Sequence, residues 1–139
     1  MDQIILDASV LIKLFHPEEQ DKIAERLLVE FNKRKLSFVI LDLALYEFVN
    51  ALKFSKKARK EFILSALTSI LDLNPEIISY SNEFMEKILD LLDKFTITLY
   101  DASFIAAAEM EKIPLLTADY KHHIKSMSKH VLHYKDFDV

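Results

Sequence analysis

Four acidic residues of this chain lie where a charged side chain is costly to place. Asp7 and Asp119 come at the ends of short apolar runs that are typical of buried strands, Asp101 stands at the start of a helical pattern, and Glu47 lies within a nearly apolar one. Because right-handed crossovers return successive parallel strands in the same direction, their carboxyl ends meet at one edge of the sheet, where ligands bind in open α/β folds. We therefore expect these four carboxylates to gather in one pocket.

Carboxylates in one pocket repel one another and take up protons unless something positive lies among them. No lysine or arginine is adjacent in sequence to any of the four acids, so a divalent cation is the simplest source of that charge. A site with oxygen ligands, no cysteine and no histidine at a metal-binding spacing favours Mg²⁺ or Mn²⁺ over Zn²⁺. Magnesium keeps several waters, which leaves room for a phosphate oxygen and a water nucleophile. The pattern therefore predicts phosphodiester chemistry.

Each acid also has an ordinary structural interpretation. Asp7 or Ser9 can cap the helix that follows the first strand, since both residue types are favoured at that position. Asp101 and Asp119 can also be helix caps, and Glu47 can pair with a distant lysine. The metal interpretation is favoured because these separate explanations would have to hold for all four residues at once.

The chain contains no glycine and no cysteine. Without glycine it has no Walker phosphate loop, Rossmann dinucleotide fingerprint or serine-hydrolase nucleophile elbow. Without cysteine it has no disulfide, thiolate zinc site or iron–sulfur cluster, which is consistent with a reducing compartment. Residues other than glycine must make the turns, and the candidates are Asn32, Asn74, Pro17, Pro75 and Pro114.

The length and charge of the chain set further limits. Its 139 residues suit a single domain spanning residues 1–139, and a formal charge of -4 argues against holding nucleic acid by overall electrostatics. No apolar run approaches the roughly 18 residues needed to cross a bilayer. Asp2 and Asp7 are also atypical of a signal peptide, so we expect a cytoplasmic protein with no membrane partner.

Alternating strand and helix patterns predict an α/β fold with a central parallel sheet of about five strands and helices on both faces. Strands are predicted at residues 4–6, 38–41, 77–78, 115–117 and 131–132. Helices are predicted over residues 10–15, 23–31, 43–54, 62–71, 82–95, 100–110 and 120–129. Within this pattern Asp42 is a candidate cap for the third helix, which is apolar on nearly every side and so expected to be buried.

Two polar features frame these elements. His16-Pro17-Glu18-Glu19 interrupts the apolar pattern between the first two helices. Nearer the end of the chain, several histidines fit no familiar zinc spacing and lie in a polar segment, so we interpret them as surface residues. They are His122, His123, His130 and His133.

Four segments containing the acids follow one another along nearly the whole chain. They are Leu6-Asp7-Ala8-Ser9-Val10-Leu11-Ile12, Glu47-Phe48-Val49-Asn50-Ala51-Leu52, Tyr100-Asp101-Ala102-Ser103 and Leu115-Leu116-Thr117-Ala118-Asp119. In this order they resemble the signature segments of PIN-domain ribonucleases, specifically the VapC-type toxins of VapBC toxin–antitoxin pairs. Each motif alone is common, but four in order are fairly specific.

This resemblance implies metal-dependent RNA cleavage that leaves a 5′-phosphate. Asp7, Asp101 and Asp119 would hold Mg²⁺ or Mn²⁺, and Glu47 would complete the metal shell or position the attacking water. Similar proteins form homodimers and are silenced by a VapB-like antitoxin that lays a peptide across the acidic site. Polar residues at matching positions beside the acids are Ser9, Asn50 and Thr117. The basic residues expected to contact the RNA backbone are Lys53, Lys56, Lys57, Arg59 and Lys60.

The chain departs from this family in its acidic net charge and in having Lys112-Ile113 where many relatives carry a glycine. Other interpretations of an aspartate after the first strand fit less well. A haloacid-dehalogenase-like phosphatase needs a second aspartate where Ser9 stands, and a response-regulator receiver needs paired acids and a late lysine that are not evident. A non-catalytic binding or assembly module with the same fold stays open as the alternative.

Overall fold

Five short strands form one parallel sheet in the order β3-β2-β1-β4-β5. The computed structural model describes residues 1–16 and 20–137. The strands are β1 (Asp2–Leu6), β2 (Leu36–Leu41), β3 (Glu76–Ile78), β4 (Leu115–Thr117) and β5 (Val131–His133). The predicted α/β class and the number of strands are confirmed.

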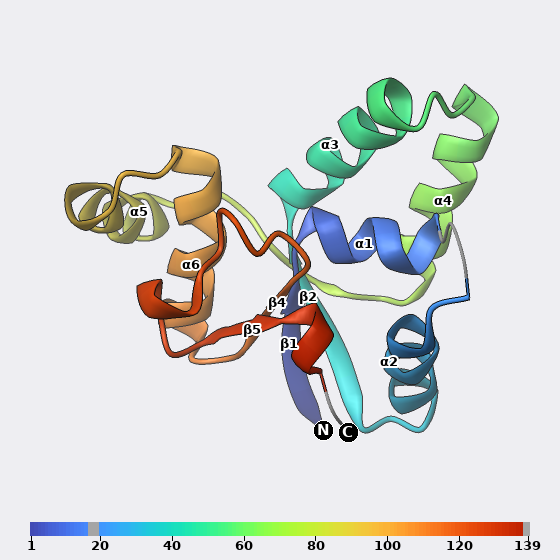
Figure 1. Ribbon diagram of the computed structural model, residues 1–139, viewed down its shortest axis with the longest axis horizontal. Coiled ribbons are helices and arrows are strands. Elements are labelled where there is room, and N and C mark those ends of the chain that lie inside the picture. Colours follow the sequence, from blue (N-terminus) through green and yellow to red (C-terminus); the bar gives the residue numbers. More distant parts are fainter. Residues whose placement is uncertain (17–19, 138–139) are drawn as a thin grey trace.

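Helices cover both faces of the sheet. They are α1 (Ala8–Phe15), α2 (Lys22–Asn32), α3 (Asp42–Asn50), α4 (Lys60–Asp72), α5 (Asn82–Lys94) and α6 (Leu99–Glu111). Figure 1 shows α1 to α4 on one side and α5 and α6 on the other, as the right-handed crossover rule requires when the chain passes from β3 back across the sheet to β4. The interruption predicted at residues 16–19, including the turn at Pro17, lies almost wholly outside the described residues.

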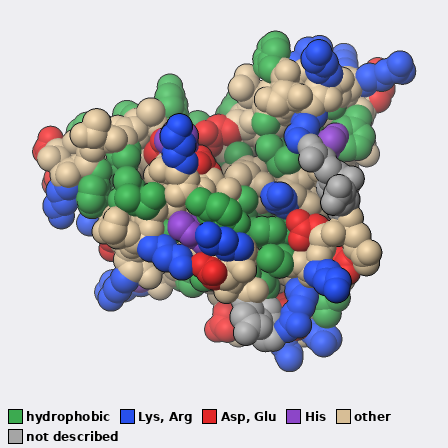
Figure 2. Space-filling view, in the orientation of Figure 1, with side chains coloured by type: hydrophobic (Ala, Val, Ile, Leu, Met, Phe, Trp, Pro, Cys, Tyr) green, Lys and Arg blue, Asp and Glu red, His purple; other side chains and the backbone are tan. Residues whose placement is uncertain are grey.

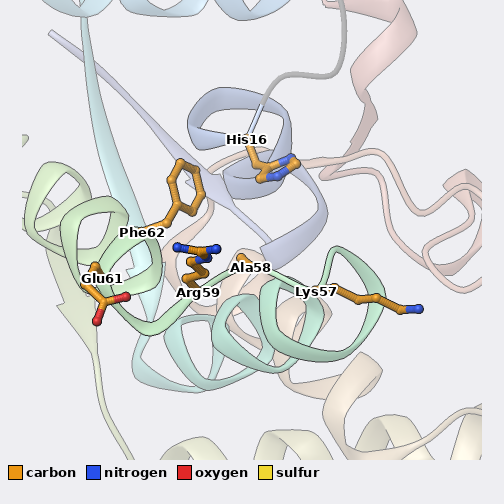
Figure 3. A pocket seen from close by; sticks show the side chains of 6 residues that line it. All are labelled: His16, Lys57, Ala58, Arg59, Glu61 and Phe62. Carbon is orange, nitrogen blue, oxygen red and sulfur yellow. The ribbon is translucent and has the colours of Figure 1, made fainter.

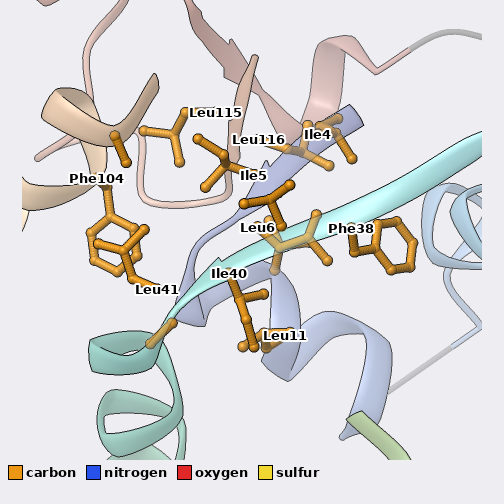
Figure 4. Packing of buried hydrophobic residues seen from close by; sticks show 14 of the residues in the cluster. Ile4, Ile5, Leu6, Leu11, Phe38, Ile40, Leu41, Phe104, Leu115 and Leu116 are labelled. Carbon is orange, nitrogen blue, oxygen red and sulfur yellow. The ribbon is translucent and has the colours of Figure 1, made fainter. Parts of the chain in front are cut away.

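The strands are apolar because both faces of the sheet are covered. Ile5 and Leu115 are fully buried, and the neighbouring positions in β1 and β4 are nearly so. Figure 4 shows these side chains packed with Phe38 of β2, Leu11 of α1 and Phe104 of α6. A parallel sheet covered in this way gives continuous apolar runs, which explains why the central strands could be predicted.

The order of the strands reverses at the centre of the sheet. From β1 the chain proceeds to β2 and β3 on one side, whereas β4 and β5 lie on the other. Leu6 pairs with Leu116, so the residues that follow β1 and β4 emerge side by side at the carboxyl edge. Such a reversal is where parallel α/β sheets open a crevice for ligands.

The helix starts are made by polar side chains near these strand ends. Asp7 is the N-cap of α1 and accepts a hydrogen bond of 3.1 Å from the N–H of Val10, so its expected capping role is confirmed. Asp42 differs from the prediction because the N-cap of α3 is Leu41, and Asp42 is the first helical residue.

The predicted helix over residues 43–54 is also divided. After α3 the chain continues as a π-helical turn, Ala51–Ser55, and this helical stretch is only partly buried. Tyr46 is 76% exposed and Phe54 is 70% exposed. The expectation of nearly complete burial was wrong because α3 packs against α1 with one face and leaves the opposite face on the surface.

The helix predicted over residues 120–129 is absent, and this correction affects the site. The segment consists of turns with one short 3₁₀ helix, Lys125–Met127. The N–H of His123 bonds to the carbonyl oxygen of Asp119 at 3.0 Å, and the carbonyl oxygen of His123 accepts from the His133 ring at 2.9 Å. These bonds hold a compact loop, because the backbone groups of His123 have partners in the turn and in β5.

Among residues 1–16 and 20–137, four take the left-handed conformation in a chain that has no glycine. They are Arg34, Lys57, Asn74 and Lys112, with φ between 52° and 59°. Asn74 was expected as a turn residue, whereas the three cations were not. None of the helices in the described part of the chain is long and apolar enough to cross a membrane.

Candidate active site

The four predicted acids line one small pocket at the carboxyl edge of the sheet. Asp7 follows β1, Glu47 comes from α3, Asp101 from the first turn of α6, and Asp119 from the loop after β4. Figure 2 shows acidic side chains and a histidine together in the notch between the part of the molecule with α5 and α6 and the part with α3 and α4. The pocket is also lined by Ala8, Ser9, Phe104 and His123. The expected convergence is therefore present in the structure.

Asp7 is the buried centre of this pocket. It is 3% exposed, and its two carboxylate oxygens accept four hydrogen bonds. Oδ1 accepts from the Ser9 hydroxyl and from the N–H of Val10. Oδ2 accepts from the Thr117 hydroxyl and faces Nδ1 of His123 at 3.2 Å. All four acceptor positions of the carboxylate are thus in use.

The hydroxyl groups of Ser9 and Thr117 connect the first and fourth strand ends. The Ser9 oxygen accepts from the N–H of Ala118 at 2.9 Å, and the Thr117 oxygen accepts from the N–H of Asp119 at 3.0 Å. Both residues therefore lie beside the acids as expected. Asn50 does not, because its side chain is exposed and does not line the pocket.

Glu47 has an unusual electrostatic environment. Its Oε1 atom is buried without a hydrogen-bond partner. Burial, followed by the negative charges of Asp7 and Asp101, raises the pKa of Glu47 from its ordinary value to about 7. A carboxyl group with this pKa can exchange a proton near neutral pH.

Asp101 and Asp119 complete the acidic wall. Asp101 accepts a hydrogen bond of 3.0 Å from the Thr98 hydroxyl, and the Thr98 oxygen in turn caps α6 by accepting from the Asp101 N–H. Asp119 lies 3.0 Å from the ring of the exposed His122. Neither acid is itself the N-cap of a helix, but both make bonds of the capping type: Asp101 and the N-cap Thr98 bond each other reciprocally, and Oδ1 of Asp119 accepts from the N–H of His122 at 3.2 Å. The capping interpretation therefore accounts for part of their bonding, although both side chains also line the pocket.

His123 is the site residue that sequence reasoning missed. It is 3% exposed, with Nδ1 near Asp7 and Nε2 3.7 Å from Oδ1 of Asp101. Burial disfavours the charged ring, but the hydrogen bond and charge of Asp7, together with the charges of Asp101 and Asp119, outweigh it and raise the pKa of His123. The surface interpretation was wrong for this histidine and for His133, which is 9% exposed.

The donor set fits a divalent cation by its chemistry. Four carboxylates offer hard oxygen ligands, the Oε1 atom of Glu47 is buried and unpartnered, and no lysine or arginine is among the residues that line this pocket. Over residues 1–16 and 20–137, no three acidic or histidine side chains already have their donor atoms gathered closely enough to hold an ion. Binding would therefore draw these side chains closer together.

The predicted basic residues lie elsewhere. Lys53 is in the π-helical turn after α3, Lys60 begins α4, and the other three lie between them, so none lines the acidic pocket. Lys57 and Arg59 instead line a separate pocket with His16 and Phe62. Figure 3 shows Arg59 close to Phe62, whereas the Lys57 side chain extends away. Beside the acids, Lys121 and His122 line a pocket that includes Asp101.

Comparison with known families identifies the family of the fold. Residues 4–127 match the PIN domain, and the chain therefore belongs to the PIN domain family. PIN domains are nucleases, so membership supports hydrolase activity on nucleic acids.

Solved structures with a similar fold come from several organisms. PAE2754 from Pyrobaculum aerophilum is 23% identical, with 96% of this chain and 92% of that chain covered and a TM-score of 0.67. The DNA-bound VapBC from Salmonella typhimurium is 14% identical, with coverage of 96% and 99% and a TM-score of 0.75. VapC20 from Mycobacterium tuberculosis, a sarcin-ricin loop cleaving toxin, is 14% identical, with coverage of 86% and 92% and a TM-score of 0.63. A comparison with curated proteins gave no match.

Proposed function

We propose that this chain is a Mg²⁺- or Mn²⁺-dependent endoribonuclease that acts in the cytoplasm as the toxin of a type II toxin–antitoxin pair. The observation that carries the proposal is the convergence of Asp7, Glu47, Asp101 and Asp119 on one pocket where the strand order of a PIN domain reverses. Burial, followed by the negative charges of Asp7 and Asp101, raises the pKa of Glu47, and the same negative charges favour binding of a cation there.

The four acids have distinct roles in this proposal. Asp7, Asp101 and Asp119 would hold the ion, and Glu47 would complete its shell or position the attacking water. The bound ion would polarise the phosphodiester and stabilise negative charge on the leaving oxygen. In its ionised form Glu47 would accept a proton from the water. Water attack on phosphorus with cleavage of the bond to the 3′ oxygen leaves a 5′-phosphate and a 3′-hydroxyl.

Three partners follow from the proposal. RNA is the substrate, with its backbone contacting the segment that contains Lys53, Lys56, Lys57, Arg59 and Lys60. A VapB-like antitoxin would place a positively charged side chain at the acidic pocket, and VapBC complexes are among the structures that share this fold. A homodimer would cover part of the exposed apolar surface, which includes Tyr46 and Phe54.

The direct test measures RNA cleavage with and without metal. Purified chain should cut a mixed RNA substrate with Mn²⁺ and not with EDTA, and Asp101→Asn should lower the rate by about 100-fold or more, because it removes a charge that holds the ion. Asp136→Asn is the matched control, since Asp136 pairs with Lys125 on the surface. Unchanged cleavage by Asp101→Asn would overturn the assignment. Specific capture of an antitoxin without cleavage of any RNA would support the binding-module alternative.

A further inference from the structure

We propose that His123 is a nitrogen ligand of the metal ion, so that this site has a mixed nitrogen and oxygen donor set. The inference rests on the proposed function, because it concerns the ion of the same pocket. It follows from the two ring nitrogens of His123, because Nδ1 is hydrogen-bonded to Asp7 whereas Nε2 has no hydrogen-bond partner.

The Nδ1 atom is committed to Asp7. Nδ1 lies 3.2 Å from Oδ2 of Asp7 and 3.1 Å from the Thr117 hydroxyl oxygen, whose own proton is donated to Asp7. Because an ionised carboxylate can only accept, the proton of the neutral ring lies on Nδ1. Histidines that bind metals almost always donate their other ring N–H to a carboxylate or a carbonyl group. Asp7 therefore gives His123 the orientation and the tautomer that a metal ligand requires.

The Nε2 atom is the free donor. It is buried in the acidic pocket without a hydrogen-bond partner and lies 3.7 Å from Oδ1 of Asp101. Two ligands that are each about 2.1 Å from one ion lie at most about 4.2 Å apart. The spacing between these two atoms is therefore compatible with a shared ion, and a buried nitrogen with no partner is costly unless something binds it.

The ring is held in this place by contacts on its other sides. The backbone carbonyl oxygen of His123 accepts from Nε2 of His133 at 2.9 Å, and the backbone N–H of His123 donates to the carbonyl oxygen of Asp119 at 3.0 Å. The ring also meets the edge of Phe104, with centroids 5.6 Å apart. Donors fixed in this way lose little entropy when they bind an ion.

His123 also resolves a difficulty with Asp7. Because the oxygens of Asp7 already accept four hydrogen bonds, Asp7 can bind an ion directly only by giving up one of them. The Nε2 atom of His123 supplies a donor on the same side of the pocket without that loss. A nitrogen donor also favours transition metals, so the chain should bind Co²⁺ and Mn²⁺ more tightly than Mg²⁺.

The test uses His123→Asn, in which the amide nitrogen reproduces the Nδ1 donor to Asp7 but no atom replaces Nε2. We expect Co²⁺ affinity, measured by calorimetry at about pH 8, to fall about tenfold or more, and Mg²⁺ affinity to change much less. Electron spin-echo spectroscopy of the Mn²⁺-loaded wild-type chain should show coupling to nitrogen, which His123→Asn should lose. His130→Asn is the control, because His130 lies near Glu109 and outside the pocket.

The outcomes separate this inference from the proposed function. A wild-type chain that binds Mn²⁺ without nitrogen coupling overturns the ligand and leaves the nuclease proposal intact. Equal Co²⁺ affinity in wild type and a folded His123→Asn does the same. A wild-type chain that binds none of the three ions overturns both. If His123→Asn does not fold, the spin-echo measurement on the Mn²⁺-loaded wild-type chain tests the inference by itself: coupling to nitrogen supports His123 as a ligand, and its absence overturns it.

Discussion

Asp7 accepts hydrogen bonds from groups that come from two distant parts of the chain. Ser9 and Val10 are its neighbours in sequence, whereas Thr117 and His123 are more than 100 residues away. Charge repulsion among the acids would by itself make Asp7 lower the stability of the metal-free protein. The contacts indicate that Asp7 instead stabilises the metal-free protein. Its carboxylate accepts four hydrogen bonds, and removing it would leave those buried donors without an acceptor.

We therefore predict that Asp7→Asn destabilises the metal-free protein by about 1–3 kcal/mol, since the amide nitrogen would face donors rather than accept from them. Urea unfolding in EDTA measures this change. Asp101→Asn should cost less, because the Asp101 side chain is partly exposed and accepts a hydrogen bond from the Thr98 hydroxyl, whereas Asp7 accepts four. A metal-free Asp7→Asn that is as stable as wild type would show that repulsion dominates.

Glu47 makes the metal-free stability depend on pH. Its pKa rises from 4.5 to about 7 on folding, so the folded state holds a proton that the unfolded chain releases earlier. Stability from this group is therefore present below its unfolded pKa and is lost as the pH rises through about 7. We predict that Glu47→Gln, in EDTA, is more stable than wild type at about pH 8, and that this difference shrinks at about pH 5. Equal differences at both pH values, measured by urea unfolding, would contradict it.

At the scale of elements, the end of α6 shows how a chain without glycine ends a helix. Lys112 has a φ of 57°, and the N–H groups of Lys112 and Ile113 both donate to the carbonyl oxygen of Ala108. This left-handed ending normally uses glycine, which has no Cβ to clash. A lysine at this position therefore has a conformational cost.

We predict that Lys112→Gly stabilises the protein by about 0.5–1 kcal/mol, because the relief of the left-handed strain exceeds the added entropy of the unfolded chain. Thermal or urea unfolding measures the gain. Lys112→Ala removes the same charge but keeps the Cβ atom, so it should give no such gain. If both variants were equally stable, the strain at Lys112 would be negligible.

At the scale of the whole molecule, negative charge gathers in the acidic pocket and positive charge gathers in residues 53–60. The chain has 22 acidic and 18 basic residues, yet a basic segment at residues 53–60 lies at the end of α3 that is remote from β2. RNA binding should therefore be local and sensitive to salt.

We predict that the double variant Arg59→Gln with Lys60→Gln weakens binding of single-stranded RNA and makes the plot of log affinity against log salt shallower by up to about 1.4, or about 0.7 per lost phosphate contact. Fluorescence anisotropy in an Asp101→Asn background avoids cleavage. The control is Lys22→Gln with Lys33→Gln, which removes two exposed cations at α2. If both double variants changed the slope equally, residues 53–60 would not be a specific RNA-binding segment.

The sequence alone determined the sheet, the helices that cover it and the convergence of Asp7, Glu47, Asp101 and Asp119. These follow from local patterns, because apolar runs mark buried strands and the topology of parallel sheets brings the strand ends together. The segment after Asp119 could not be predicted in this way. Its polar residues at helical spacing are typical of an exposed helix, but its backbone bonds and the burial of His123 depend on contacts with β5, Asp7 and Phe104.

The tertiary structure therefore decided which nitrogen-bearing side chain lies among the acids. In sequence, no lysine or arginine adjoins them, and a histidine near Asp119 has no pattern that distinguishes it from its exposed neighbour His122. Only folding shows that His123 turns inward while His122 remains on the surface. The physical reason is that burial of an ionisable ring is favourable only where its partners are already assembled, and those partners come from the N-cap of α1, from β4 and from α6.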